Sequence, residues 1–183
     1  MSRMLESCIL EHIQESRILG DPLEVCRMKP KPTKESITIM SHLMMPADAN
    51  TVGFVHGGVI LKLVDIISYI CASKHSGKYC VTASIDRVNF LQPIRIGELV
   101  ILYASVNYVG NTSMEVGVRV EAENLRSGKR RHTNSCYVTM VSVSNKGKPI
   151  KAPKVIPQTK EEKLRYEEAE KRRKERLMKK AKI

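Results

Sequence analysis

The chain has 183 residues, 42% of them hydrophobic, which suits one domain with extensions and a sizeable core. Its formal net charge of +12 favours an anionic partner such as nucleic acid, anionic lipid or a phosphorylated small molecule. No apolar run approaches the roughly 20 residues that span a bilayer, which argues against stable membrane insertion. Five cysteines without zinc-like spacing, and an N-terminus unlike a secretory signal, predict a soluble protein of the reducing cytoplasm without a metal site.

The first 35 residues form a predicted extension in two pieces. The first piece favours a short helix, because its apolar side chains recur at helical spacing, and residues 27–32 are expected to be an extended Pro/Lys linker. Residues 36–45 are typical of a strand that ends at Pro46. The apolar residues of the first piece are Leu5, Ile9, Ile13 and Ile18.

A polar loop and one long helix follow. The segment PADANTVGFVHGG, residues 46–58, is rich in turn-forming residues, and its length suggests function rather than simple connection. A helix is predicted from about Gly57 to Lys74. Its apolar residues cover more than one face, so we expect it to be buried on most sides.

Four strand-like segments come next, each with alternating apolar and polar residues and each separated from the next by turn residues. In one of them Val116, Val118 and Val120 alternate with polar or charged positions. The short connections predict antiparallel neighbours, and therefore an α+β fold in which an antiparallel sheet wraps one long helix. The four segments are residues 80–90, 99–109, 114–124 and 132–144.

The character of the chain changes after a run that holds three prolines, residues 149–157. Residues 158–183 hold eleven Lys/Arg, six Glu and few apolar residues, which predicts a mostly solvated helix or one laid against a neighbouring subunit. The predicted organisation is an N-terminal extension and linker at 1–35, one domain at 36–157 and a charged helix at 158–183.

The pair Gly57-Gly58 and the acidic residue Asp65 are the candidate catalytic groups. Adjacent glycines at the start of a helix expose backbone N–H groups, which can hold a negatively charged oxygen together with the helix dipole. Asp65 lies about two turns further along the same helix among apolar residues, so it needs a partner or a function. Oxyanion donors near a carboxylate predict hydrolysis of an acyl group.

Structural roles for these residues stay open as alternatives. Asp65 could pair with Lys62 or cap a neighbouring loop, and His56 could hold the loop by a hydrogen bond. The two glycines could serve close packing of the helix on a strand.

Three stretches, PADANTVGFVHGGVILKLVD, VTASIDRVNFLQPIRIGE and YVGNTSMEVGVRVEAEN, together resemble the hotdog-fold acyl-CoA thioesterases, and among them the cytosolic long-chain acyl-CoA hydrolase group. The resemblance covers about residues 36–182, with the charged segment VIPQTKEEKLRYEEAEKRRK. It implies an antiparallel sheet of five or six strands around a central helix. It also implies hydrolysis of medium- to long-chain acyl-CoA to fatty acid and CoA, with no metal or other cofactor. The implied assembly is a homodimer with two interface sites, commonly in a trimer of dimers.

The resemblance also implies roles for single residues. Asp65 takes the place of the family's helix carboxylate, as general base or as nucleophile, and Gly57 or Gly58 supplies the amide that polarises the thioester carbonyl. His56 keeps the family's His-Gly-Gly context.

One position departs from the family pattern. Certain members carry Asn or Asp where this chain has Phe54, and a phenyl ring cannot activate water. We therefore expect Asn50, or an interface hydroxyl such as Thr82 or Ser84, to substitute for that side chain.

Coenzyme A carries several phosphates, and basic residues and a small polar turn are candidates to bind it. A basic residue taken singly is more often a solvated surface charge, so that alternative stays open for each of them. The acyl chain is expected beside the helix, along Ile60, Val64 and Tyr69. The basic candidates are Arg87, Lys129, Arg130 and Arg131, and the turn candidates are Asn111, Thr112 and Ser113.

Two other functions are weighed against hydrolysis. An acyl-CoA sensor that binds DNA fits the charge, but residues 1–35 are too short and Pro-rich for a helix-turn-helix, so no nucleic-acid partner is expected. A hydroxyacyl-CoA dehydratase would use a His with a carboxylate, which His56 and Asp65 could provide.

Overall fold

The computed structural model describes residues 29–86 and 88–180. The predicted N-terminal helix therefore lies outside the described residues. Two short 3-10 turns, η1 (Thr33–Glu35) and η2 (Pro46–Asp48), precede the long helix. The other elements in chain order are β1 (Lys31–Pro32), β2 (Thr38–Leu43), α3 (Gly57–Ser76), β3 (Tyr79–Ile85), β4 (Leu99–Val109), β5 (Ser113–Glu123), β6 (Arg130–Val143), β7 (Val155–Ile156) and α4 (Lys160–Lys180).

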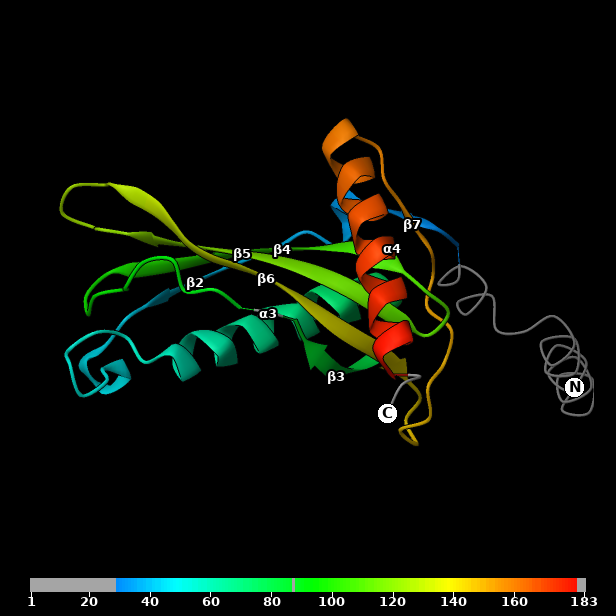
Figure 1. The fold of residues 1–183 in the computed structure, drawn as a ribbon, viewed down its shortest axis with the longest axis horizontal. Helices are drawn as coiled ribbons and strands as arrows, with labels where there is room; N and C mark the ends of the chain where they lie inside the picture. The colour runs from blue at the N-terminus through cyan, green and yellow to red at the C-terminus, as the bar shows by residue number, and fades with distance from the viewer. Residues whose placement is uncertain (1–28, 87, 181–183) are drawn as a thin grey trace, which may run out of the picture.

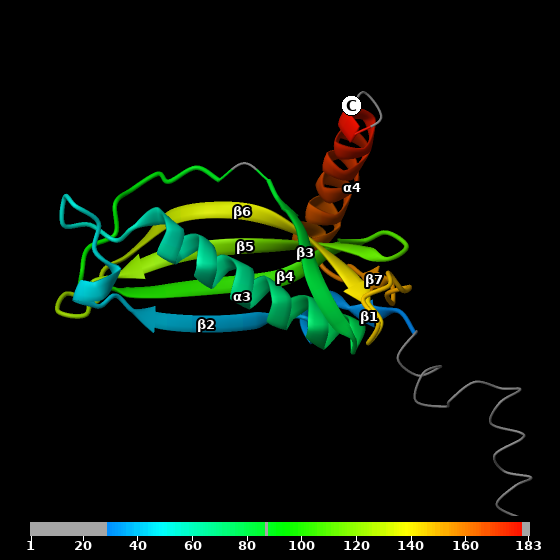
Figure 2. The same cartoon turned by 90° about the horizontal axis from the view of Figure 1, so that it is seen from below.

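Five strands form one antiparallel sheet in the order β2-β4-β5-β6-β3. The helix α3 lies against one face of this curled sheet, and α4 stands against the opposite face (Figures 1 and 2). The predicted α+β fold, with an antiparallel sheet wrapped around one long helix, is thereby confirmed, with five strands in the sheet.

The core lies between α3 and the sheet. Alternate residues of the central strands face the helix, as the pattern of period two requires, and β5 contributes three valines that are at most 3% exposed. These core valines are Val116, Val118 and Val120, and α3 packs Ile60, Leu63, Val64 and Ile67 against the sheet.

The prediction that α3 is buried on most sides is wrong for the single chain. Ile66, Tyr69 and Ile70 form an exposed apolar stripe along it. The reason is that the sheet covers one side of the helix only, and its edge strand β3 leaves the neighbouring side open.

Defined caps set the two ends of α3. His56 caps the first turn with its side chain, and Gly77 ends the helix in the left-handed conformation at φ 65°, donating its N–H to the Ser73 carbonyl at 2.8 Å. Lys31 Nζ donates to the His75 carbonyl at 2.7 Å and so satisfies another last-turn acceptor.

A second, parallel sheet of two short strands joins distant parts of the chain. Lys31 pairs with Val155 and Pro32 with Ile156. The residues of the predicted Pro/Lys linker that are described are extended, but their pairing was not predicted. Strands of two residues leave no periodic signal in a sequence.

The charged helix α4 packs on its own chain rather than standing free in solvent. The Tyr166 ring packs against the Tyr108 ring at a tilted angle, with centroids 4.9 Å apart, and Ala169 is fully buried. The expectation of a mostly solvated helix is corrected for this side of α4.

Charge pairs fix α4 to the sheet below these apolar contacts. Glu115 of β5 is only 2% exposed and accepts from Arg172 at 2.8 Å and from Arg176 at 3.2 Å. Arg176 also reaches Asp86, just after β3, at 2.5 Å, and the Arg172 guanidinium lies 3.6 Å from the centre of the Tyr137 ring. A buried carboxylate that holds two arginines resists separation, because removing either partner would leave a buried charge.

Candidate active site

Asp65 of α3 and Thr82 of β3 form the centre of the candidate site. The Thr82 hydroxyl donates to Asp65 Oδ1 at 2.5 Å and lies 3.4 Å from the Met140 sulfur. Among the described residues no group reaches the other carboxylate oxygen, and no ion pair joins Asp65 to Lys62. The half-buried carboxylate is thus held by one oxygen and available through the other.

The glycine pair presents one free amide rather than two. The Gly58 N–H donates to His56 Nδ1 at 2.9 Å, so the imidazole caps the helix and occupies that donor. The Gly57 N–H meets no acceptor within the described part of the chain. A Cβ at Gly57 would stand 3.3 Å from the Phe90 ring, which covers this residue.

His56 holds the loop, as the structural alternative proposed. Its own N–H donates to the Asp48 carbonyl at 2.8 Å, and its Nδ1 accepts from Gly58. A ring that accepts through Nδ1 is neutral and carries its proton on Nε2.

Asn50 shapes the loop before α3. Its Oδ1 accepts from the backbone N–H groups of Val52 at 3.0 Å and Phe54 at 3.1 Å, and its own N–H donates to the Phe54 carbonyl at 2.7 Å. No described contact joins Asn50 to Asp65 within one chain.

The remaining hydroxyl candidate and one basic candidate contribute no described contact. Ser84 follows a bulge after Thr82 in β3, is half-buried and makes no side-chain hydrogen bond with the described residues. Arg87 lies outside the described residues.

Comparisons with known proteins decide the family. Residues 52–129 match the family model of the thioesterase superfamily. Protein VdlD of Helicobacter pylori is 47% identical over 135 residues, which cover 74% of this chain and 77% of that protein. The chain belongs to the thioesterase superfamily.

Further relatives and solved structures agree with this assignment. The cytosolic acyl coenzyme A thioester hydrolase of Homo sapiens is 36% identical over 87% of this chain and 43% of that protein. The acyl-CoA hydrolase of Bacillus cereus matches with a TM-score of 0.80 and 40% identity, over 84% of this chain and 94% of that one. The Staphylococcus aureus acyl-CoA hydrolase, solved with butyryl coenzyme A, matches with a TM-score of 0.78 and 33% identity, again over 84% and 94%. The family resemblance of the sequence is confirmed.

Arg131 of this thioesterase is already paired within the chain: it holds the loop at Pro93 instead of leaving its guanidinium open to a phosphate. Its guanidinium binds Glu98 through two hydrogen bonds of 2.7 Å and the Pro93 carbonyl at 2.8 Å. Hydrogen bonds from Arg131 are the main reason that the pKa of Glu98 is lowered. Ile94, next to Pro93, accepts from Val55, the residue before His56.

The other predicted phosphate ligands of the thioesterase lie far apart. Arg130 pairs with Glu123 at 2.6 Å on the surface, and Lys129 is exposed beside it. The turn with Asn111, Thr112 and Ser113 lies at the other end of β5, which begins at Ser113. The 11 residues of β5 separate the two groups by about 36 Å at 3.3 Å per residue, so one chain cannot bring both to the same phosphate.

Within one chain the polar turn makes no described contact with Asp65. The start of β5 is separated from β3 by β6 alone, and the register places Met114 level with Met140 and Thr82. The structure thus brings together Asp65 and Thr82, and separately His56, Gly57 and Gly58.

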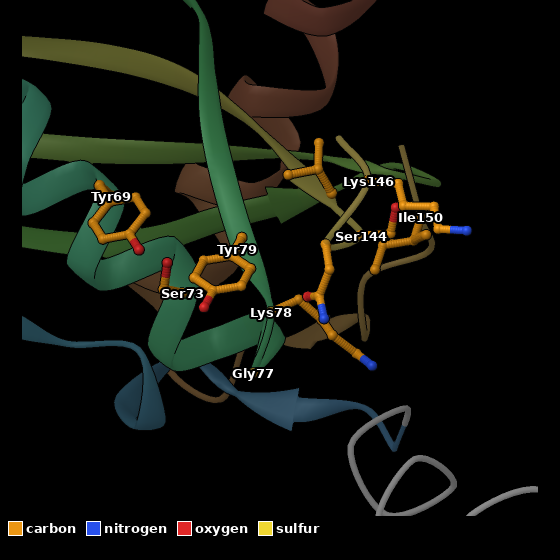
Figure 3. A pocket seen from close by; sticks show the side chains of 10 residues that line it. Tyr69, Ser73, Gly77, Lys78, Tyr79, Ser144, Lys146 and Ile150 are labelled. Atoms are coloured by element: carbon orange, nitrogen blue, oxygen red, sulfur yellow. The ribbon is translucent and has the colours of Figure 1, made fainter. Parts of the chain in front are cut away.

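A pocket of about 810 Å³ opens at the C-terminal end of α3 (Figure 3). Sequence reasoning missed it, except for Tyr69, which was expected beside the acyl chain. Ile60 and Val64, the other two residues of that expected tunnel, are packed in the core and are at most 1% exposed in the single chain. The pocket residues are Tyr69, Ser73, Gly77, Lys78, Tyr79, Val143, Ser144, Asn145, Lys146 and Ile150.

Two further properties of the described residues bear on the site. They contain no group of three or more His, Cys, Asp or Glu side chains that could hold a metal ion. None of their helices is long and apolar enough to cross a membrane.

Proposed function

We propose that this thioesterase hydrolyses medium- to long-chain acyl-CoA to a free fatty acid and CoA, and that it works in the cytoplasm. The human relative is named a cytosolic acyl-CoA thioester hydrolase. The observation that carries the proposal is the Asp65 carboxylate, which the Thr82 hydroxyl holds at 2.5 Å while its other oxygen stays available. Exposed Ile66 and Ile70 beside it offer an apolar surface for an acyl chain.

In the proposed reaction Asp65 takes a proton from a water molecule that attacks the thioester carbonyl carbon. The Gly57 N–H donates to the carbonyl oxygen as negative charge develops there, and one such donor is typically worth about 3 kcal/mol. The C–S bond then breaks, and the thiolate of CoA leaves and takes up the proton. Direct attack by Asp65 on the carbonyl carbon, through an anhydride that water then hydrolyses, is the alternative route.

We infer that the working unit is a homodimer, assembled further as a trimer of dimers. The outer edge of β3 pairs with no strand of the described residues, and unpaired strand edges readily add another strand. Beside it lies a continuous exposed apolar surface of the kind that marks protein interfaces. Two neighbouring structures are described as hexameric thioesterases. The exposed apolar residues are Ile66, Tyr69, Ile70, Tyr79, Val81 and Ile85.

Asn50 belongs to the proposed site together with Asp65 and Thr82. Structures of the S. aureus hydrolase were determined with an Asn, an Asp and a Thr each changed to Ala. Those three positions follow one another at the same two intervals that separate Asn50, Asp65 and Thr82 here. Since no contact joins Asn50 to Asp65 within one chain, we infer that Asn50 of the partner subunit completes the site.

The test is release of free thiol from acyl-CoAs of different chain length by the native protein and by Asp65→Asn. We expect turnover of medium and long chains and a loss of about a hundredfold or more in the variant, the scale of general-base removal. Lys62→Gln, an exposed change one turn away, is the control and should keep native turnover. Turnover near the native rate in a folded Asp65→Asn protein would remove Asp65 from the mechanism.

The same assay separates the other two functions. A sensor would release no thiol, and a dehydratase would act on hydroxyacyl-CoA without releasing CoA. The His56 ring already disfavours the dehydratase, because its Nδ1 is occupied by the Gly58 N–H.

A further inference from the structure

A further pocket, the α4 pocket, has a volume of about 380 Å³ and lies on the face of the sheet that α4 covers, opposite α3 (Figures 1 and 2). Thr33 of η1 and the α4 residues Glu162 and Arg165 line its walls. Asp65 lies on the other side of the sheet, and none of the lining residues belongs to the apolar surface assigned to the partner subunit. The pocket is therefore separate from the candidate active site. Its floor consists of two neighbouring cross-strand rows of β4, β5 and β6, the first with Tyr103, Arg119 and Ser135 and the second with Ser105, Gly117 and Tyr137.

Gly117 makes this floor hollow. Glycine inside a strand weakens it and often marks a close approach of a ligand or of another part of the chain. Here the Asn107 side chain lies over the glycine, since a Cβ at Gly117 would stand 2.5 Å from Asn107 Nδ2. Tyr103 and Tyr137 come from the strands on either side of β5, two strand spacings or about 10 Å apart. A flat group over Gly117 would thus have an aromatic side chain on each side.

The deep part of the pocket holds neutral polar groups without partners. Asn107 is only 6% exposed, and its side-chain amide makes no hydrogen bond with the described residues. The hydroxyl groups of Tyr103 and Ser105 make none with them either. A buried amide without a partner is costly, so a ligand that supplies one gains binding free energy. Since these groups carry no charge, the ligand group that suits them is a neutral donor and acceptor such as a hydroxyl.

The positive charges of the pocket are at its mouth. The Arg119 and Arg165 side chains are 55% and 56% exposed. With the described residues, Arg119 donates to Glu121 through Nε alone, at 2.8 Å, and Arg165 lies 3.8 Å from Glu161, beyond hydrogen-bond distance. Glu162 is the acidic residue of the described lining, and its Oε2 is already bound by two backbone N–H groups, at 2.6 Å and 3.1 Å. Two guanidinium groups with free N–H donors beside a concave surface attract an anion.

We propose that the α4 pocket binds a small hydroxylated aromatic acid. Its carboxylate would be held at the mouth by Arg119 and Arg165, its ring would lie over Gly117, and its hydroxyl would reach the Asn107 amide. A singly charged carboxylate suits guanidinium groups that stay more than half exposed, because it keeps part of its hydration there. The site goes beyond the proposed hydrolysis and does not depend on it.

Calorimetric binding of para-hydroxyphenylpropionate tests the charged mouth. We expect its Kd to rise about tenfold in Arg119→Gln/Arg165→Gln, the value of a hydrogen bond to a charged group. The control is Lys163→Gln/Lys171→Gln, which removes two exposed charges from α4 outside the pocket and should leave Kd unchanged. The corresponding alcohol, which lacks the carboxylate, should bind the native protein and the arginine variant equally.

Phenylpropionate, which lacks the hydroxyl, tests the neutral floor. We expect it to bind the native protein about fivefold more weakly than the hydroxylated acid, the value of one neutral hydrogen bond. Gly117→Ala places a methyl group where the Asn107 amide lies and should abolish this difference. Thermal unfolding shows whether each variant is folded, and the arginine variant decides alone if Gly117→Ala is not.

Two results would overturn the proposal. One is equal affinity for the hydroxylated acid in native protein and arginine variant, and the other is no binding of that acid to native protein at millimolar concentration. Thiol release enters none of these measurements, so a failure of the proposed hydrolysis would leave their outcome unchanged.

Discussion

The Thr82 hydroxyl decides which oxygen of Asp65 is available for chemistry. It binds Oδ1 at 2.5 Å, and Oδ2, which has no partner among the described residues, is the oxygen that we expect to accept a proton from water. A β-branched residue in a strand has few side-chain rotamers, and this restricts where the hydroxyl can point. The carboxylate is thereby held in one orientation before substrate arrives, which spares the reaction the cost of ordering it.

Thr82 variants test this orienting role. Thr82→Val keeps the shape of the side chain and removes the hydroxyl, and we expect kcat to fall about tenfold to a hundredfold, the value of a hydrogen bond to a charged group. Thr82→Ser retains the donor and should keep most of kcat, with KM little changed in both variants. Steady-state kinetics with one acyl-CoA measures both constants. A native kcat in Thr82→Val would show that the hydrogen bond has no part in the reaction.

At the level of elements, α3 carries the candidate site in its first half and a buried, hydrogen-bonded histidine in its last turn. His75 in its last turn is fully buried, and its Nε2 lies 2.9 Å from the Pro153 carbonyl in the segment that leads to β7. The Nε2–H donates to this carbonyl, and Nδ1 has no partner among the described residues. Burial is the main reason that the pKa of His75 is lowered from 6.5, opposed by the Pro153 carbonyl and Glu35 and reinforced by Lys31.

The buried His75 makes the free energy of unfolding depend on pH, and the direction of its pKa shift fixes the sign of this dependence. Below about pH 6.5 the unfolded chain protonates this histidine, while the folded chain keeps it neutral down to its lowered pKa. The unfolded state then binds more protons than the folded state. The contribution of His75 to the free energy of unfolding is therefore fully present above about pH 6.5 and decreases as the pH falls below that value. Urea unfolding at about pH 7.5 and about pH 5.5 measures the difference. His75→Gln keeps a hydrogen-bond donor but does not titrate, so its free energy of unfolding should fall less between the two pH values. An equal fall in both proteins would show that His75 does not cause the pH dependence.

Periodicity was sufficient to predict the main elements and insufficient for the contacts between them. The strand at 99–109 and the start of α3 at Gly57 were predicted at their observed bounds, because long alternating or helical patterns carry a strong signal. The strand predicted at 80–90 ends at Ile85, just after the bulge between Thr82 and Ser84.

The candidate site was predicted in its residue types more than in its arrangement. Asp65 and the glycine pair follow from their places on one helix, but the bond from Thr82 depends on how β3 is placed beside α3. The turn before β5 and the basic hairpin after it stay predicted ligands of coenzyme A. Consecutive antiparallel strands put successive turns at opposite ends, so these two groups cannot contact the same phosphate within one chain.

At the scale of the whole molecule, the separation of Asn50 from Asp65 argues that the functional unit is larger than one chain. Asn50 lies in the loop before α3, whereas Asp65 is about 12 Å along the helix from Gly57. The exposed stripe of α3 and the free edge of β3 lie on the same side as Asp65 and Thr82. A second copy that covers this surface would be placed beside the carboxylate, and two-fold symmetry would make each chain give and receive one loop.

Complementation between two inactive variants tests this exchange. Asp65→Asn and Asn50→Ala should each be nearly inactive alone, because every site of either assembly lacks one group. In co-expressed chains about half of the dimers are mixed, and each mixed dimer regains one site with Asp65 from one chain and Asn50 from the other. We therefore expect recovery of about a quarter of native thiol release. If each chain held its own complete site, a mixed dimer would contain two damaged sites, and co-expression would restore nothing.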